Sequence, residues 1–374
     1  MKMLAMRGRQ IGLSLVEMMI ALTLGAIVSV GVIQLFSANS DTYDLMQGQS
    51  RMQESARFAL LTIARSAEQA GYKGCYSTTN SVYSTVTVAN IPYEFNIIRG
   101  MQGYDGQMAG GWIPDPTAEF GTPFISGNQI DLSKIVTGTD ILTIRSASQD
   151  QADLVSDMPT STEPIYVKVP SSGLGFALND LAIIHDCEES TIFRVTGITM
   201  DSPAAGDATI GHDTSDVDAT RNTFLKLGQE NTYSKDAAVS AIMTTTFFIA
   251  PGSGVNNVGD TPLALWRKYG TAAPVELVEG VEDLQLLYGL DSDGDGTPDT
   301  YVKANLVPSA DFSKVVSLRI SISVNSVDDV GAFQSKPPLG CISAGGQQKC
   351  INGGPYDGLA RRTFHQTVQL RNQG

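Results

Sequence analysis

The pattern of hydrophobic and polar positions separates the first part of the chain from the rest. Residues 13–36 form an almost unbroken apolar run in which Glu17 is the only charged residue. A helix over this run, rising about 1.5 Å per residue, is long enough to cross the ~30 Å hydrocarbon core of a membrane. The run therefore predicts one membrane-spanning helix with a single carboxylate near its start.

The helical pattern continues beyond the apolar run, through residues 37–74. Apolar side chains recur there at spacings of three and four residues, which places them on one face of a helix. These positions are Met52, Ala56, Ala59, Ile63, Ala67 and Ala70. We expect one helix from Leu13 to Ala70, about 87 Å long, with half in the membrane and half packed on a globular head.

Residues 75–374 show short β-rich runs separated by Gly, Pro, Asn, Asp and Ser, so the sequence predicts an α+β protein with a large antiparallel β-rich head. The segment 183–195 predicts a hairpin. A possible boundary between two lobes lies near residues 200–240. The expected strands are Val82–Val88, Ile141–Arg145, Ile165–Val169, Leu181–His185, Ile192–Thr199, Ala241–Ala250, Leu263–Tyr269, Leu284–Leu290, Val315–Val324 and Thr363–Leu370.

The distribution of charges along the chain predicts how the apolar helix is oriented across the membrane. The chain carries a formal charge of −14, which argues against a nucleic-acid partner, and its 42% hydrophobic and 17% charged residues are typical of a globular protein. Residues 1–12 contain Lys2, Arg7 and Arg9 and no acid, so the remainder carries −17. A basic segment before the apolar run predicts a cytoplasmic amino end, with everything after Phe36 outside the cytoplasm.

A cleaved secretory signal peptide and an ordinary signal anchor are the alternatives for this amino terminus. Small residues at 37–40 could serve as a signal-peptide cleavage site. Glu17 interrupts the apolar run, however, and the helical pattern does not stop after it. A carboxylate within a membrane segment costs about 2.5–3.5 kcal/mol on insertion scales, so it predicts a function and a partner.

The six residues from Gly12 to Glu17, Gly-Leu-Ser-Leu-Val-Glu, follow a short basic leader and open the apolar helix. They resemble the type IV prepilin signal. In that family a membrane peptidase cleaves after the glycine and N-methylates the new first residue. The resemblance implies that residues 1–12 are a leader, that cleavage falls between Gly12 and Leu13, and that Glu17 is the assembly carboxylate. Leu13 replaces the commoner phenylalanine, and Gln34 stands where many major pilins carry a helix-bending proline.

The chemistry of Glu17 follows from that cleavage. Removing the leader creates an ammonium group at Leu13, only four residues before the carboxylate. In a stack of such helices, the carboxylate of one chain can meet the ammonium of its neighbour, and each compensates the other in a low-dielectric bundle. This pairing would fix the axial register of the helices.

Four further stretches resemble the PilW-type minor pilins. They are residues 71–75, 277–296, 315–324 and 361–372. The resemblance implies a non-enzymatic minor pilin that helps prime and assemble a type IV pilus near the fibre tip and supports twitching motility and adhesion. It implies an inner-membrane precursor, and as partners the prepilin peptidase, the assembly platform, other minor pilins, the major pilin and a tip adhesin.

Two other functions stay open. A J-type pseudopilin of a type II secretion system shares the same amino-terminal pattern. A membrane-anchored periplasmic enzyme or binding protein belongs to a different class, but the sequence contains no nucleophile elbow, Walker loop or HExxH motif.

The four cysteines of an exported head predict disulfides. Cys341 and Cys350 are nine positions apart, close enough for a bridged loop, which leaves Cys75 to pair with Cys187 and tie the end of the stalk to the predicted hairpin. Three pairings of four cysteines are formally possible, and buried reduced cysteines are the alternative.

An acidic segment resembles a calcium-binding loop. Oxygen-bearing residues occupy positions 1, 3, 5, 7 and 9, and Gly296 stands at position 6, as in an EF-hand loop. These candidate ligands are Asp291, Asp293, Asp295, Thr297 and Asp299. Position 12 is Val302, not glutamate, so the sequence predicts either weak affinity or a further ligand from elsewhere in the chain, for example Asp283 or Glu282. The alternative is a solvated acidic turn.

Overall fold

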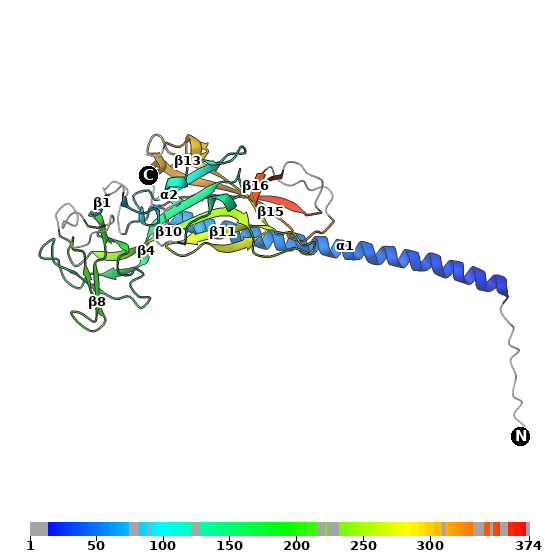
Figure 1. Ribbon diagram of the computed structural model, residues 1–374, viewed down its shortest axis with the longest axis horizontal. Helices are drawn as coiled ribbons and strands as arrows, with labels where there is room; N and C mark the ends of the chain where they lie inside the picture. The colour runs from blue at the N-terminus through cyan, green and yellow to red at the C-terminus, as the bar shows by residue number, and fades with distance from the viewer. Residues whose placement is uncertain are drawn as a thin grey trace, which may run out of the picture.

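A long helix and a β-rich head make up the molecule, as the sequence predicts (Figure 1). The computed structural model describes residues 14–74, 82–87, 90–120, 127–214, 221–222, 232–308, 311–331, 340–344, 347–351 and 358–371. Helix α1 (Leu15–Glu68) is continuous, its first half extends freely from the head, and its second half packs against the head along one face. The short helical turns are α2 (Thr117–Phe120) and 3₁₀ turns at Tyr93–Phe95, Leu132–Lys134, Ala304–Leu306 and Asp311–Lys314.

Three hydroxyl groups in the exposed half of α1 are hydrogen-bonded within the helix. The hydroxyls of Thr23, Ser29 and Thr42 donate to the carbonyl four residues earlier, at 2.6, 2.8 and 2.7 Å. Such bonds remove the cost of placing a hydroxyl in an apolar surrounding. This half of α1 is long and apolar enough to cross a membrane, and none of its most apolar stretch is buried by the head.

The second half of α1 packs through a face of mostly small residues. The predicted positions Met52, Ala56, Ala59, Ile63, Ala67 and Ala70 are all buried, which confirms the amphipathic pattern. Gly48 lies close to the head, since a Cβ there would lie 3.1 Å from Cβ of Ser326 and 3.3 Å from Cγ1 of Val330. Small side chains let the helix axis approach the strands closely.

Two sheets enclose this half of α1. The first is a four-stranded antiparallel sheet in the order β14–β13–β15–β18. Its strands are β13 (Val281–Leu290), β14 (Thr300–Val302), β15 (Val315–Asn325) and β18 (Arg361–Gln369). Inward residues such as Leu286, Leu318 and Ile320 join Ile63 of α1 in one hydrophobic core.

The second sheet has nine strands among the described residues and is organised around β10 (Ala238–Pro251). β4 pairs along one edge of β10, while β6 pairs with its beginning and β11 with its end on the other edge. The remaining strands are β1 (Val82–Ser84), β2 (Met101–Gly106), β3 (Trp112–Ile113), β4 (Ile141–Asp153), β6 (Leu181–His185), β7 (Ser190–Arg194), β11 (Leu263–Tyr269) and β12 (Val275–Glu279). The long β4–β10 pair therefore contributes residues to two separate hydrophobic cores.

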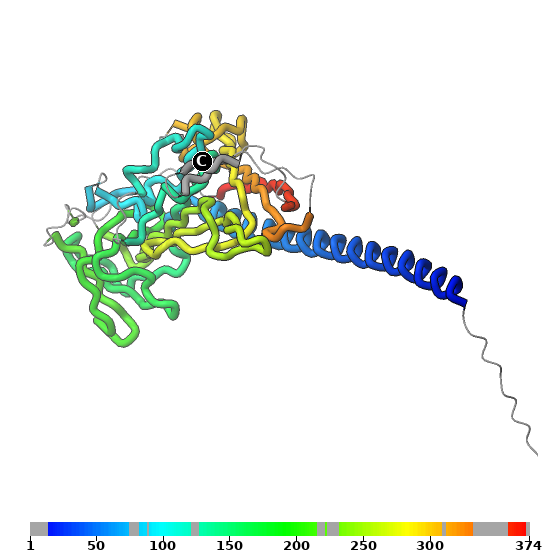
Figure 2. The backbone as a smooth tube through the Cα atoms, turned by 45° about the vertical axis from the view of Figure 1, so that its right-hand side comes forward, coloured from blue at the N-terminus to red at the C-terminus, as the bar shows by residue number. Residues whose placement is uncertain are grey.

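A second hydrophobic core lies beyond the end of α1. Its buried residues fall between Ala152 and Val239, and it contains a three-stranded sheet of β5 (Ile165–Lys168), β9 (Asp207–Gly211) and β8 (Gly197–Met200). Figures 1 and 2 show this part, in green, at the end of the molecule away from the exposed half of α1. The lobe boundary near 200–240 stays a prediction.

With one exception, the predicted strands agree with the structure apart from their ends. Leu181–His185 and Leu263–Tyr269 have the predicted bounds, and β6 and β7 form the predicted hairpin. The predicted strand Ile192–Thr199 is divided between β7 and β8, which belong to different sheets. A separate hairpin of β16 (Gly340–Ala344) and β17 (Gln347–Ile351) places Cys341 directly opposite Cys350.

A buried carboxylate joins the two sheets. The carboxylate of Asp140 accepts hydrogen bonds from the backbone N–H groups of Gly106, at 3.0 Å, and Leu286, at 2.7 Å. Burial raises the pKa of Asp140 to about 7, although these two bonds act in the opposite direction. The neighbouring charge of Asp105 raises this pKa further, and that of Lys303 lowers it.

The packing of α1 leads to a first prediction. Replacing Ile63, which is fully buried, with alanine should lower the free energy of unfolding by about 2–5 kcal/mol, because it leaves a cavity between the helix and the sheet. Leu61→Ala on the same helix, at a position 41% exposed, should cost about 1 kcal/mol or less. Denaturant unfolding of the detergent-solubilised chain measures both, and equal losses would contradict the packing described.

The buried Asp140 leads to a second prediction. Its folded pKa of about 7 exceeds the usual value of 3.8, so the folded state binds the proton more tightly. Its contribution should therefore make the chain more stable as the pH falls from about 7 to about 4. Asp140→Asn should remove this contribution. The natural chain should therefore lose more stability than the variant does when the pH is raised from 5 to 8. Thermal unfolding at both values tests this, and the exposed Asp260→Asn should show no such change.

Candidate functional site

The first candidate site is the start of α1. Ser14 caps the helix: its hydroxyl accepts the N–H of Glu17 at 3.1 Å, and the Glu17 carboxylate accepts the N–H of Ser14 at 2.9 Å. This reciprocal arrangement is a capping box, and the Ser-x-x-Glu spacing is the signal in the sequence from which it could have been predicted. Gly12 and Leu13, the predicted cleavage and methylation positions, lie outside the described residues.

The capping box holds the carboxylate at the extreme end of an exposed apolar surface. Phe36 is 77% exposed, Leu22 69%, and Ile27 and Leu35 67%. In water such a surface is unfavourable, so this half of the helix requires lipid or other helices around it. Within either surrounding, the charge of Glu17 requires a cation close to it.

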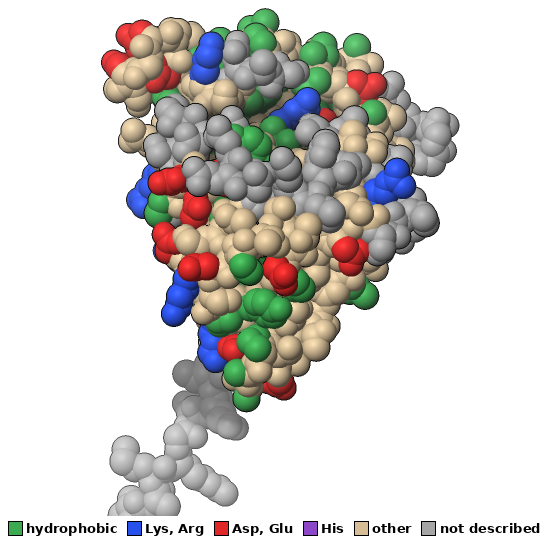
Figure 3. Space-filling model, turned by 90° about the vertical axis from the view of Figure 1, so that its left-hand side faces the viewer, with side chains coloured by type: hydrophobic (Ala, Val, Ile, Leu, Met, Phe, Trp, Pro, Cys, Tyr) green, Lys and Arg blue, Asp and Glu red, His purple; other side chains and the backbone are tan. Residues whose placement is uncertain are grey.

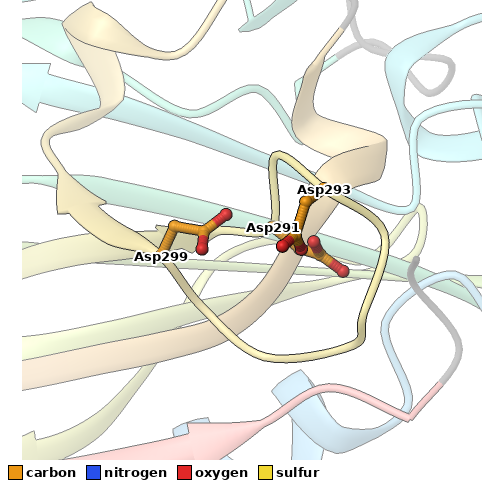
Figure 4. Close-up of side chains that lie close together, drawn as sticks. All are labelled: Asp291, Asp293 and Asp299. Atoms are coloured by element: carbon orange, nitrogen blue, oxygen red, sulfur yellow. The ribbon is translucent and has the colours of Figure 1, made fainter.

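The second candidate site is the loop that joins β13 to β14. Carboxylate oxygens of Asp291, Asp293 and Asp299 all lie within 4.8 Å of one another (Figure 4). Asp291 is buried and the other two are exposed, so one side of the group is anchored and the other is open to solvent.

Backbone groups of the loop fix this arrangement. Asp291 accepts the N–H groups of Gly294 and Gly296, at 2.6 and 2.7 Å, and Asp299 accepts that of Ser292 at 2.8 Å. Gly294 and Gly296 have φ angles of +83° and +81°, a conformation that favours glycine. The alternation of aspartate and glycine thus lets the chain turn sharply around the Asp291 carboxylate.

Not every predicted ligand points to the same place. The carboxylate of Asp295 accepts the N–H and hydroxyl of Thr297, at 2.7 and 2.6 Å, and it does not belong to the group of three. The idea that Glu282 or Asp283 completes the site is wrong. Both lie at the other end of β13, about 26 Å along the strand, where Glu282 pairs with Arg361 at 2.7 Å.

The electrostatics of the loop favour a cation. The N–H of Gly296, with further backbone N–H groups, lowers the pKa of Asp291. The N–H of Asp295 acts in the same direction on Asp293, yet the negative charges of Asp295 and Asp299 raise the pKa of Asp293 on balance. Carboxylates that repel one another at this spacing are stabilised by a bound divalent ion, and oxygen ligands on a turn suit Ca²⁺.

The cysteines are placed as follows. Cys187, in the turn between β6 and β7, is disulfide-bonded, and its predicted partner Cys75 lies outside the described residues. The preceding residue, Gly74, lies against His185, since a Cβ there would be 2.1 Å from the imidazole. The end of the stalk therefore reaches the hairpin that carries Cys187. The Cys75–Cys187 and Cys341–Cys350 bridges stay predictions.

Two serine–histidine contacts occur among the described residues, and neither resembles a catalytic site. His185 contacts Ser240 at 2.9 Å, but both are buried, and burial lowers the pKa of His185 to about 4. His365 contacts Ser321 at 2.7 Å on the exposed surface of the four-stranded sheet. In this part of the chain no carboxylate is hydrogen-bonded to either imidazole in the manner of a catalytic triad.

Comparison with known families matches both ends of the chain. The family described as type IV pilus-assembly protein W matches residues 246–372, from the second half of β10 to the end of β18. The prokaryotic N-terminal methylation motif matches residues 7–33, which include Glu17 and much of the exposed part of α1. No curated protein and no solved structure matches the chain. The strands that enclose the second half of α1 thus come largely from the matched region, and the second hydrophobic core lies outside it.

Proposed function

We propose that this chain, whose two matched regions are those of a type IV minor pilin of the PilW type, primes and assembles a type IV pilus from a position near the fibre tip. One observation supports the assembly role most directly. The apolar half of α1 is entirely outside the head and begins with a charged residue, Glu17, that has no cation beside it among the described residues. A membrane-anchored enzyme or binding protein would account for the apolar helix but not for the carboxylate within it.

The methylation motif and the apolar helix belong to an inner-membrane-anchored pilin that is later incorporated into the pilus. Before assembly, lipid surrounds the exposed half of α1. Within a fibre, neighbouring helices take the place of the lipid, which requires no change in the fold of the chain. The head stays outside the cytoplasm in both states, where disulfides are stable.

Cleavage after Gly12 provides the partner for Glu17. The new ammonium would belong to Leu13, the residue directly before the capping serine in the sequence. When a second helix lies alongside, the carboxylate of Glu17 exchanges its bond to the N–H of Ser14 for an ion pair with the neighbouring ammonium. In a dry helical bundle this exchange is favourable because it pairs two charges that would otherwise be buried alone.

The shape of the head supports a place near the tip. The second core extends past the end of α1 along the direction of the helix (Figure 1). In a fibre of parallel helices this is the space that the head of the next subunit would occupy, so a terminal position accommodates it best. The end face of this part shows apolar side chains gathered among acidic ones (Figure 3), which suits contact with another protein.

The proposed partners follow from this position. The prepilin peptidase and the inner-membrane assembly platform act on the precursor, and other minor pilins and the major pilin contact the assembled α1. A tip adhesin would contact the end face, which connects the chain to adhesion and twitching motility. A J-type pseudopilin of type II secretion uses the same mechanics, but the matched family is that of pilus assembly.

We also propose that the β13–β14 loop binds Ca²⁺ through Asp291, Asp293 and Asp299. Water and loop carbonyls would complete the coordination, since Val302 replaces the bidentate glutamate of an EF-hand. The ion would hold the β13–β14 hairpin in one conformation.

The assembly role predicts that Glu17→Ala abolishes incorporation into pili while leaving the head folded. Immunoblots of sheared pili should show at least a tenfold loss, because the unpaired ammonium of a neighbour opposes docking. The melting temperature of the detergent-solubilised chain should not change. Glu54→Ala, at an exposed position further along α1, is the matched control and should incorporate normally.

Two results would contradict the assembly proposal. The first is normal incorporation of Glu17→Ala, or a mature amino terminus other than N-methylated Leu13 by mass spectrometry. The second is a deletion strain that retains normal surface pili but fails to secrete enzymes, which is the outcome that the pseudopilin alternative predicts.

The calcium proposal predicts that Ca²⁺ stabilises the chain by about 2.7 kcal/mol when present at a hundredfold excess over its Kd. Asp291→Asn should abolish this gain, whereas Asp260→Asn in an exposed loop should keep it. Thermal unfolding with calcium and with a chelator measures the difference. A melting temperature that does not respond to the chelator would show that the loop is only a turn.

A further inference from the structure

One face of the nine-stranded sheet changes from apolar to polar at the point where α1 ends. Along β4, the side chains on this face are Leu142 and Ile144 and then Ser146 and Ser148, since alternate residues of a strand share a face. The first two belong to the core that contains α1, and the serines do not. The polar part of the face is therefore outside the helix–sheet interface.

The same change from apolar to polar side chains occurs on the neighbouring strands β10 and β11. On β10, Phe247 pairs with Leu142, and Met243 pairs with Ser146. On β11, Arg267 lies opposite Phe247, and Tyr269 lies opposite Thr245. Register thus brings a guanidinium, an aromatic ring and several hydroxyls to one place on the sheet.

The last turn of α1 forms a wall beside this polar area. Together they enclose an open cavity of about 320 Å³, which Ser66 and Gln69 of the helix end line with Ser146, Ser148, Arg267 and Tyr269. Small-molecule sites in proteins have volumes of roughly 300–1,000 Å³, so the cavity suits a ligand of one or two sugar rings.

Arg267 is the feature that indicates a ligand. Its Nε is buried without a hydrogen-bond partner, and among the described residues its guanidinium forms no hydrogen bond or ion pair. Two buried arginines of the head differ: Arg145 donates to the carbonyls of Tyr93 and Arg99, and Arg361 pairs with Glu282. A half-buried charged donor without an acceptor is costly, so an acceptor supplied from outside would stabilise it.

The groups around Arg267 narrow the chemistry of that acceptor. The planar guanidinium fork matches a carboxylate, to which it can donate two parallel hydrogen bonds. The serine hydroxyls and the amides of Gln69 and Gln149 can bond to ligand hydroxyls. Asp150 also lines the cavity, and its negative charge disfavours a doubly charged phosphate relative to a single carboxylate.

Tyr269 supplies an apolar platform. The side chain is 43% exposed, its hydroxyl donates to the sulfur of Met243 at 3.3 Å, and its ring centre lies 5.8 Å from the guanidinium carbon of Arg267. The ring is therefore held in one orientation beside the cation, where the C–H face of a sugar can pack on it.

We propose that this cavity binds a monoanionic hydroxylated carboxylate of the uronic acid class. Arg267 would hold the carboxylate, Tyr269 the face of the ring, and the serine and glutamine side chains its hydroxyls. The site is distant in sequence from Glu17 and from the aspartate loop, and it does not depend on the proposed role in pilus assembly.

The test titrates the full chain in detergent with galacturonate, glucose, acetate and glutamate, using isothermal titration calorimetry and ligand-observed NMR. Galacturonate should bind, and glucose, acetate and glutamate should each bind at least tenfold more weakly. Equal binding of glucose or of glutamate would overturn the assignment of the ligand class. Equal binding of acetate would reduce the cavity to a simple anion site, and no binding of galacturonate would remove the proposal.

Single-residue variants test whether galacturonate binds in this cavity. Arg267→Gln should weaken galacturonate binding at least tenfold, a loss of about 1.4 kcal/mol. Tyr269→Leu and Ser148→Ala provide independent tests if the first variant folds poorly, which its melting temperature shows. The matched control is Arg57→Gln, an exposed arginine on α1 outside the cavity, which should leave binding unchanged. Undiminished binding by folded Arg267→Gln would overturn the proposal even if galacturonate binds.

Discussion

The close contact between α1 and the two sheets is the constraint on which the rest of the structure depends. The first half of α1, outside the head, must be apolar on all sides. The second half, which packs on the head, must be apolar on one side only. Alanine at positions 56, 59, 64 and 67 lets both sheets approach the helix, and Ile63 fills the space between them. The same helix therefore transmits any force on the membrane-embedded end directly to the core of the head, without a flexible joint among the described residues of α1.

Glu17, the aspartates of the β13–β14 loop and Arg267 are incompletely neutralised by the described residues, and each lies where another molecule can approach. Glu17 bonds only to its own helix end, the three aspartates of the β13–β14 loop face one another, and Arg267 faces a cavity. Some buried charges are paired within the head, as with Glu282 and Arg361 or Glu94 and Lys268. We propose that the groups not paired in this way are sites for a neighbouring subunit, a metal ion and a small ligand.

The structural features that could be predicted from the sequence are those that depend on the local pattern of apolar and polar residues. The helix, its buried face and most strands of the head follow from periodicities of 3.6 and 2, and Glu17 stands out because an acid is rare in an apolar run. Strands such as Met101–Gly106 and Asp207–Gly211 were missed because glycine and aspartate weaken their β pattern, and sheet pairing stabilises them instead. The cavity beside Arg267 could not be predicted, because it results from the register of three strands and the place where α1 stops. The aspartate loop was predicted, but the inward or outward orientation of Asp295 depends on its bonds to Thr297.

The way in which the second core joins the head has a consequence for how such a chain can change. Asp153 and Ala238, the last residue of β4 and the first of β10, are direct partners across the β4–β10 pair. The chain thus enters the second core and returns from it at neighbouring points, as it would if a short turn connected the two strands. The β6–β7 hairpin within this segment belongs to the nine-stranded sheet and contacts the end of the stalk, so it must stay in place. The three-stranded sheet of β5, β8 and β9 is outside that sheet, and its loops could be lengthened or shortened during evolution without moving the stalk. The anchoring half of the molecule and its outer end are consequently free to diverge at different rates.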